Sequence, residues 1–341
     1  MPGPDRVVRL PEAVANQIAA GEVVERPASV VKELVENAVD AGATRVEVDV
    51  EQGGQRRIRV TDDGEGMSPA DAVACLERHA TSKIRAADDL IRVQTLGFRG
   101  EALPSIASVS RFRLTTRRPD DEAGTRVVVE GTRAPEVEGC GAAVGTQVEV
   151  EDLFFNVPAR KKFMRRPSTE MGHITEAVTR LALATPRVAF RLRAADRVVL
   201  DAPADDGRDP KGRIGRVLGR HAAERLLAIP PDDRPHAIEV AGFISEPGFH
   251  ERTSRSLYVF LNGRFIRDRG VQHAILEPYR TLMERGRFPV CVLHLAVDPV
   301  IFDVNVHPQK TEVRFRSPQD VHRAVFGALS RALDAGLDRP A

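Results

Sequence analysis

The sequence predicts an α+β protein of two domains, and three observations lead to this prediction. Its 341 residues exceed the size at which a single hydrophobic core usually keeps growing. Helix-like segments come first, and strand-like segments follow in groups instead of alternating with helices. A polar stretch rich in Pro, Asp and Gly, "DAPADDGRDPKG" (201–212), separates the two halves. We therefore expect one domain over residues 1–205 and a smaller one over 206–341.

The first domain begins with a helical pattern over residues 11–40, with Pro27 at the entry to the main helix. Residues 44–51 and 56–63 alternate apolar and polar side chains, and "QGG" between them favours an antiparallel hairpin. The remaining elements expected here are a short helix near 69–78, strands at 111–117, 125–130 and 145–151, and a helix at 168–185. Together they predict a mixed, largely antiparallel sheet under helices, which is a two-layer α/β sandwich.

The second domain has strand-like runs that bracket a helical segment. The elements expected here are helices at 212–220, 268–285 and 318–335 and strands near 238–244, 256–262 and 290–297. Because a helix lies between the last two strands, we expect a βαβ crossover.

Composition excludes several classes of protein. Hydrophobic residues make up 42% and charged residues 29%, and no apolar run approaches the roughly 18 residues of a membrane span. The charged N-terminus is broken by prolines and does not resemble a secretory signal. Cys75, Cys140 and Cys291 are far apart, so neither a zinc motif nor a disulfide framework is indicated. We expect a cytoplasmic protein without a membrane partner.

The net charge of +1 conceals an asymmetry between the two halves. Residues 1–205 carry 29 basic and 32 acidic side chains, a net of −3, whereas residues 206–341 carry 21 and 17, a net of +4. Nearly all the positive charge is arginine, which suits phosphate recognition. A compositional bias of the coding sequence explains the same numbers more simply.

The stretch "KELVENAVDAG" (32–42) is a helix closed by glycine, with one polar face. Its members are Lys32, Glu33, Glu36, Asn37 and Asp40. Glu33 and Asn37 are one turn apart. An asparagine oxygen is a neutral ligand for Mg²⁺, and a glutamate one turn earlier can orient an attacking water. A solvated helix face explains this stretch, taken alone, better than a site does.

Two glycine-punctuated stretches follow. In "TDDGEGM" (61–67), Asp62 can accept a hydrogen bond from an adenine amino group, while Gly64 and Gly66 allow close approach of a flat base. An ordinary turn is an equally good interpretation. In "LGFRGEALPSIASV" (96–109), backbone N–H groups before a helix start can cradle a triphosphate, although a flexible loop has the same pattern.

Upstream of that loop, "RHATSK" (78–83) supplies two hydroxyls and an ammonium, at Thr81, Ser82 and Lys83. An ordinary helix C-terminus is the alternative interpretation.

The motifs in this order strongly resemble the GHKL ATPase superfamily and, within it, the MutL family of DNA mismatch-repair proteins. The segments that carry the resemblance are 16–43, "DDGEGM", "RHATSKI", "GFRGEAL", "LFFNVPARKKF" (153–163), "LYVFLNGRFIRD" (257–268) and "FDVNVHPQKTEVRF" (302–315). They span nearly the whole chain, so the resemblance is highly specific.

The resemblance implies a Bergerat-type ATPase domain followed by a ribosomal-S5-domain-2-like βαβ transducer domain, with ATP and Mg²⁺ as ligands. Glu33 corresponds to the general base, Asn37 to the magnesium ligand, and Asp62 to the adenine-reading aspartate. Thr146 would support Asp62, and Lys310 would reach the γ-phosphate from the second domain. The expected cofactor-binding set is completed by Gly66, Met67, Thr81, Ser82, Lys83 and the lid segment Gly97, Phe98, Arg99, Gly100, Glu101, Ala102 and Leu103.

The chain departs from the family pattern in three respects. Asp63 stands where the family often has asparagine, and Val157 where threonine is common. Family members usually continue into a C-terminal dimerisation domain, whereas this sequence ends at Ala341. We expect an N-terminal portion, so any endonuclease activity would lie outside this chain.

Two basic clusters are candidate DNA contacts. They are Arg264, Arg267 and Arg269 in "NGRFIRDR", and Lys161, Lys162, Arg165 and Arg166 in "RKKFMRR". The resemblance places Arg269 in a DNA-binding groove, although a solvated charged face is an equally good interpretation. The absence of tryptophan argues against base stacking, so contact with the phosphate backbone is expected.

The resemblance implies a slow ATPase whose ATP-dependent homodimerisation closes two heads over DNA at the nucleoid. Its partners would be the mismatch-recognition protein MutS and downstream repair enzymes. A topoisomerase or Hsp90-type head is the nearest alternative, and "RHATSK", "GFRGEAL" and "NVHPQKTEVRF" favour the MutL family over it. A catalytically silent bridging module is a third hypothesis, and the acidic residue at position 33 argues against it.

Overall fold

A computed structural model describes residues 21, 23–83, 100–232, 237–303 and 313–337. The described chain forms two compact units. The first contains the residues up to 83, 100–178 and 190–199, and the second contains 179–189 and the residues from 200 onward. The chain thus crosses between the units more than once.

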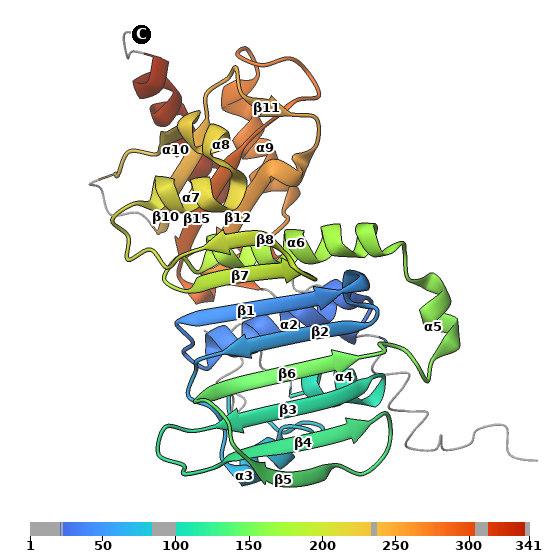
Figure 1. The fold of residues 1–341 in the computed structure, drawn as a ribbon. Helices are drawn as coiled ribbons and strands as arrows, with labels where there is room; N and C mark the ends of the chain where they lie inside the picture. The colour runs from blue at the N-terminus through green and yellow to red at the C-terminus, as the bar shows by residue number, and fades with distance from the viewer. Residues whose placement is uncertain (1–20, 22, 84–99, 233–236, 304–312, 338–341) are drawn as a thin grey trace, which may run out of the picture. The chain divides into compact units, whose positions relative to one another are not determined.

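The first unit is built on an eight-stranded sheet with the order β5-β4-β3-β6-β2-β1-β7-β8 (Figure 1). Its strands are β1 (Arg45–Glu51), β2 (Arg57–Asp62), β3 (Arg111–Arg117), β4 (Gly124–Glu130), β5 (Glu136–Cys140), β6 (Gly145–Glu151), β7 (Ala189–Ala194) and β8 (Arg197–Ala202). β1 and β2 form the expected hairpin, with Val46 opposite Asp62. β2 pairs antiparallel with β6, so Asp62 lies opposite Thr146.

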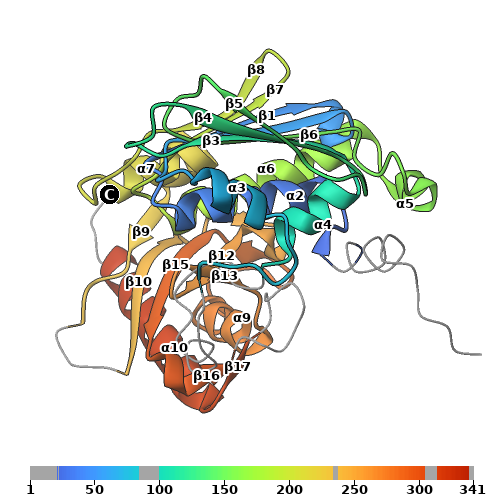
Figure 2. The same cartoon turned by 90° about the horizontal axis from the view of Figure 1, so that it is seen from below.

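Helices cover one face of this sheet, which gives the two-layer α/β sandwich that the sequence predicts (Figure 2). They include α2 (Pro27–Asp40), α3 (Pro69–Ala74) and α4 (Ala102–Ser108). Alternation along β1 and β3 buries every second side chain beneath these helices. α6 (Pro167–Ala184) follows the short α5 (Pro158–Phe163), at whose N-cap Val157 offers no side-chain hydrogen bond.

The second unit contains a five-stranded sheet with the order β13-β12-β15-β10-β9. Its strands are β9 (Leu226–Ala228), β10 (Ile238–Ser245), β12 (Leu257–Leu261), β13 (Arg264–Ile266) and β15 (Cys291–Val297), and its helices are α7 (Pro210–Leu218), α8 (Arg220–Glu224), α9 (Arg269–Leu276) and α10 (Pro318–Leu337). β12 runs parallel to β15, with α9 between them in the chain, so the predicted βαβ crossover is confirmed. Two short ladders complete the unit, β11 (His250–Glu251) with β14 (Phe288–Pro289) and β16 (Phe302–Asp303) with β17 (Arg314–Phe315).

A buried arginine holds together the start of the second unit. The guanidinium of Arg213 on α7 donates hydrogen bonds to the carbonyls of Ala182 and Val188 at 3.0 and 2.9 Å and to that of Ala202 at 2.6 Å. Burial lowers its pKa to about 10, which leaves it charged at neutral pH. One side chain therefore satisfies backbone acceptors from three separate segments.

The structure differs from the sequence-based elements in several places. β5, β7 and β8 were not expected. The helix expected over 268–285 ends at Leu276, because Pro278 lacks the N–H that would continue it. Pro278 lies instead in the first turn of the 3₁₀ helix η4 (Glu277–Tyr279). The helix expected near 69–78 ends at Ala74.

None of the helices in the described part of the chain is both long enough and apolar enough to cross a membrane.

Candidate nucleotide-binding site

The position of α2 follows from its apolar side. Val30, Val31 and Val35 are fully buried, and Leu34 is 3% exposed. Burial of each such side chain contributes about 1.5–3 kcal/mol, so the rotation of the helix against β1 and β2 is fixed. Glu33 and Asn37 then lie along the half-buried edge of the helix.

The polar face of α2 is less open than the sequence predicts. Glu36 is only 8% exposed, and Lys32 donates hydrogen bonds to Glu36 at 3.0 Å and to Glu33 at 3.1 Å. Burial alone would lower the pKa of the Lys32 ammonium, but the two carboxylates outweigh it and raise that pKa well above its usual value. The expectation that Glu36 belongs to a solvated face is therefore wrong, because Lys32 neutralises it in place.

Asn37 has a cation at its side-chain oxygen. The ammonium of Lys83 donates to Asn37 Oδ1 at 2.9 Å and to Asp40 Oδ2 at 2.6 Å. Asp40 and Lys83 side chains are 6% and 19% exposed, so this pair is shielded from water. The structure thus brings Lys83, from "RHATSK", onto the same helix edge as Asn37.

Asp62, at the end of β2, is held by two backbone donors on one oxygen. Gly64 N and Thr146 N donate to Oδ1 at 2.9 and 3.3 Å. Within the described chain, Oδ2 accepts no hydrogen bond and is available to a ligand. Burial raises the pKa of the Asp62 carboxyl, the two backbone hydrogen bonds oppose this, and Asp63 adds a further increase.

Asp63 has a separate role. Its carboxylate accepts hydrogen bonds from the backbone N–H groups of Thr44 and Arg45, both at 2.8 Å, and so secures the start of β1. The two hydrogen bonds to Asp62 Oδ1 come from Gly64 and Thr146, whereas Asp63 acts on Asp62 through its charge.

Two glycines let the backbone close around Asp62. Gly66 has φ +67°, and a Cβ there would lie 2.2 Å from the carbonyl oxygen of Arg117. Gly145 has φ +110°, and its Cβ would lie 2.1 Å from the carbonyl oxygen of Asp62. Any side chain at either position would push strands apart, so only glycine fits. Gly145 was not among the predicted site residues.

Thr116 on β3 is a second residue that the sequence analysis missed. It is 1% exposed, and its hydroxyl accepts from Met67 N at 2.9 Å and donates to Gly145 O at 3.0 Å. The Thr146 hydroxyl lies 3.0 Å away. Thr116 shares its side of β3 with the buried Phe112 and Leu114, and a polar residue on that apolar face was a signal in the sequence.

The remaining predicted residues divide into two groups. Thr81 Oγ1 accepts a hydrogen bond from Lys83 N at 3.2 Å, and Gly100 O accepts one from His79 N at 3.2 Å, so "RHATSK" packs against the start of "GEAL". Ser82 is exposed, and Glu101, Ala102 and Leu103 form the half-buried start of α4. Gly97, Phe98, Arg99 and Lys310 lie outside the described residues.

The two basic clusters are on different units. Lys161 and Lys162 are exposed on α5 in the first unit. In the second unit Arg264 lies on β13, and the exposed Arg267 and Arg269 flank the N-cap of α9.

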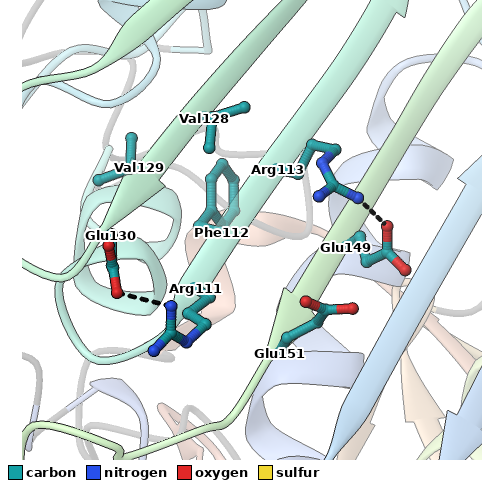
Figure 3. A pocket seen from close by; sticks show the side chains of 8 residues that line it. All are labelled: Arg111, Phe112, Arg113, Val128, Val129, Glu130, Glu149 and Glu151. Atoms are coloured by element: carbon teal, nitrogen blue, oxygen red, sulfur yellow. Dashed lines mark hydrogen bonds and ion pairs between the residues drawn. The ribbon is translucent and has the colours of Figure 1, made fainter.

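A shallow hollow between β3, β4 and β6 lies apart from these motifs (Figure 3). Cross-strand ion pairs occupy it, with Arg113 2.9 Å from Glu149 and Arg111 2.6 Å from Glu130. Its charges are already paired, and none of the predicted site residues lines it. We do not assign it to the nucleotide.

Replacing Thr116 tests the hydrogen-bond link between these loops. Thr116→Val keeps the shape but leaves the half-buried Met67 N–H without its acceptor, which should cost about 1–3 kcal/mol of unfolding free energy. Chemical denaturation of wild type and variant measures it. Thr115→Val, on the opposite side of the strand, is the control and should change stability by less than about 0.5 kcal/mol. Equal effects of the two substitutions would contradict the assignment.

Two family models match separate parts of the chain. Residues 25–135 match the family model described as "Histidine kinase-, DNA gyrase B-, and HSP90-like ATPase". Residues 214–334 match the one described as "DNA mismatch repair protein, C-terminal domain".

Curated relatives match nearly the whole chain. It is 55% identical over 328 residues to the DNA mismatch repair protein MutL of Anaeromyxobacter dehalogenans, covering 96% of this chain and 53% of that protein. It is 52% identical over 338 residues to MutL of Geobacter sulfurreducens, covering 97% and 54%. The chain therefore spans about half the length of the curated relatives it matches.

Solved structures share the fold. The Aquifex aeolicus MutL ATPase domain complexed with ADP is 27% identical, with a TM-score of 0.63 over 94% of this chain and 100% of that one. A structure described as "Crystal Structure of N terminal domain of a DNA repair protein" has a TM-score of 0.78 at 22% identity, over 96% and 100%, and shows the fold alone. The mixed α/β fold with its large sheet is that of the GHKL ATPases, and the chain belongs to the MutL family of DNA mismatch-repair proteins.

Proposed function

We propose that this chain is an ATP-binding and slowly hydrolysing head that uses Mg²⁺, with the nucleotide seated between α2 and the loops after β2. One observation carries the proposal. The carboxylate of Asp62 accepts hydrogen bonds from the backbone of Gly64 and Thr146 on one oxygen, and its other oxygen accepts none from the described residues. An adenine amino group is a donor that fits this acceptor.

The donor set also fits a magnesium ion. Mg²⁺ takes oxygen ligands and shares its remaining positions with waters and substrate phosphates. Asn37 Oδ1 already faces the Lys83 ammonium at 2.9 Å, so this oxygen is oriented toward positive charge. When bound, the ion would neutralise charge on the β- and γ-phosphates.

Each residue of the site then has a distinct task. Glu33, which accepts a hydrogen bond from Lys32, would orient the attacking water and accept its proton. Lys83, Thr81, Ser82 and the lid from Gly97 to Leu103 would contact the phosphates, and Lys310 would reach the γ-phosphate. Thr146 and Gly66, with Met67, would complete the adenine pocket. Gly145 and Thr116 would act as positioning residues behind them.

The curated relatives are about twice as long as this chain. For a protein of that length, we propose that ATP drives association of two heads into a homodimeric clamp on DNA. Hydrolysis would release the clamp. The clamp would couple the mismatch-recognition protein MutS to downstream repair enzymes, in the cytoplasm at the nucleoid. What supports this is membership of the MutL family and the exposed basic residues on both units.

Substitutions of Glu33 and Asn37 should affect ATP binding and hydrolysis differently. Glu33→Ala should leave ATP affinity within a few-fold and slow hydrolysis by about 10²-fold or more, because only proton transfer is lost. Asn37→Ala should weaken both Mg²⁺-dependent binding and hydrolysis. A coupled phosphate-release assay and equilibrium nucleotide binding separate the two. Normal hydrolysis by Asn37→Ala would overturn the metal assignment.

Asp62 should set the preference for adenine. Asp62→Asn keeps an acceptor for the two backbone N–H groups but places an amide donor where the adenine amino group would bind. We expect the ratio of ATP to GTP affinity to fall by about tenfold or more, with little change in thermal stability. Competition binding with both nucleotides measures this ratio. Equal affinity of the wild type for ATP and GTP would remove Asp62 from its role.

Backbone contact with DNA should depend on salt. Arg269→Ala and Lys162→Ala should each weaken DNA binding for all sequences and reduce the slope of log K against log salt by about 1. Arg255→Ala, exposed on the second unit and equal in charge change, is the control. Salt-independent affinity of the wild type would contradict a phosphate interface.

A further inference from the structure

Three metal-ligating side chains converge in the second unit, and none of them is assigned a role above. His273 lies in the last turn of α9, Glu277 begins η4, and His322 lies in the first turns of α10. The Nδ1 of His273, a carboxylate oxygen of Glu277 and the Nε2 of His322 all lie within 4.8 Å of one another.

The distances between these atoms match a tetrahedral ion. Nδ1 of His273 is 3.3 Å from Nε2 of His322. Oε2 of Glu277 is 2.9 Å from Nε2 of His322 and 3.9 Å from Nδ1 of His273. Ligands bound tetrahedrally at zinc distances of about 2.0–2.1 Å are separated by about 3.3 Å. The three sides of the triangle bracket that value.

The surrounding packing holds the three residues in place. His273 and Glu277 are four residues apart, so they share one helical face. α9 and α10 pack against each other. The neighbours Ala274 and Val321 are buried in the core of this unit, at 0% and 3% exposure. The imidazole of His322 is further stacked on Phe326, with ring centroids 6.3 Å apart. The cluster is therefore presented by rigid elements and not by a loop.

Hydrogen bonding alone leaves this cluster incompletely satisfied. A proton on His322 Nε2 can be directed at Glu277 or at His273, but not at both. Glu277 Oε2 is shielded from solvent and accepts no well-directed hydrogen bond from the described residues, although His322 lies within ion-pair distance. Two imidazole nitrogens and one carboxylate oxygen this close together form a donor set that a bound dication would satisfy.

We propose that His273, Glu277 and His322 form a binding site for a divalent transition-metal ion, with Zn²⁺ as its ligand. Imidazole nitrogen with one carboxylate suits Zn²⁺, whereas Mg²⁺ and Ca²⁺ prefer all-oxygen sets. The His273 side chain is 73% exposed, so water can supply the fourth position. The ion would join α9 to α10 across 49 residues of chain. This site shares no residue with the proposed nucleotide site and is independent of the function proposed for it.

Zinc binding to the chain, freed of any purification tag and treated with chelator, tests the proposal. Isothermal titration with ZnCl₂ should give one tight site per chain, and the melting temperature should rise with Zn²⁺ but not with Mg²⁺. His273→Asn, Glu277→Gln and His322→Asn should each weaken this site by about tenfold or more, as lost metal ligands do. His221→Asn, an exposed helical histidine of the same unit, is the control and should bind as wild type does.

The melting temperature without metal shows whether each variant folds. Metal-free variants that melt as wild type does, yet gain no stability from Zn²⁺, would support the site. Absence of a tight site in the wild type would overturn it, and so would unchanged affinity in the His273→Asn, His322→Asn double variant. If any single variant unfolds, the Co²⁺ complex of the wild type decides instead, because tetrahedral nitrogen and oxygen ligation gives strong visible absorption and a hexaaqua ion does not.

Discussion

The burial of one side of α2 against the sheet is the constraint on which the site depends. Four residues on this side, Val30, Val31, Leu34 and Val35, are at most 3% exposed, and they leave the helix no freedom to rotate. A rotation of one residue, about 100°, would take Glu33 and Asn37 away from the edge they share. Hydrophobic packing thus sets where the side chains of Glu33 and Asn37 lie. These polar residues supply the functional groups but do not determine their position.

The second constraint is the close approach of backbone segments behind Asp62. β2, β3 and β6 are neighbours in the sheet, and the loops that leave them are joined through the hydroxyl of Thr116 and the backbone of Gly145. Gly66 and Gly145 both have positive φ, and each lies against a backbone carbonyl oxygen, so neither position allows a larger side chain. A carboxylate in such a place has its pKa raised by burial, and a donor from a ligand would stabilise its charged form.

Much of this arrangement could be predicted from the sequence, and the failures have physical reasons. Strands with clear alternation, such as β1, β3 and β6, were located within a residue or two of their ends. β5 was missed because it is an exposed edge strand with almost no buried side chain, and β8 because both of its valines are exposed. Glu36 was misplaced because helical periodicity does not reveal that Lys32 neutralises a buried carboxylate. Local pattern nominated Glu33, Asn37 and Asp62 without separating a site from a solvated face or an ordinary turn. The family motifs gave these residues their roles, and the roles stay predictions.

The most direct test of the account is a crystal structure with a non-hydrolysable ATP analogue and Mg²⁺. We expect Asn37 Oδ1 to exchange the Lys83 ammonium for the metal ion at about 2.1 Å, and Asp62 Oδ2 to accept a hydrogen bond from the adenine amino group. A nucleotide bound elsewhere would contradict this assignment. So would a bound nucleotide whose phosphates contact neither Glu33 nor Asn37.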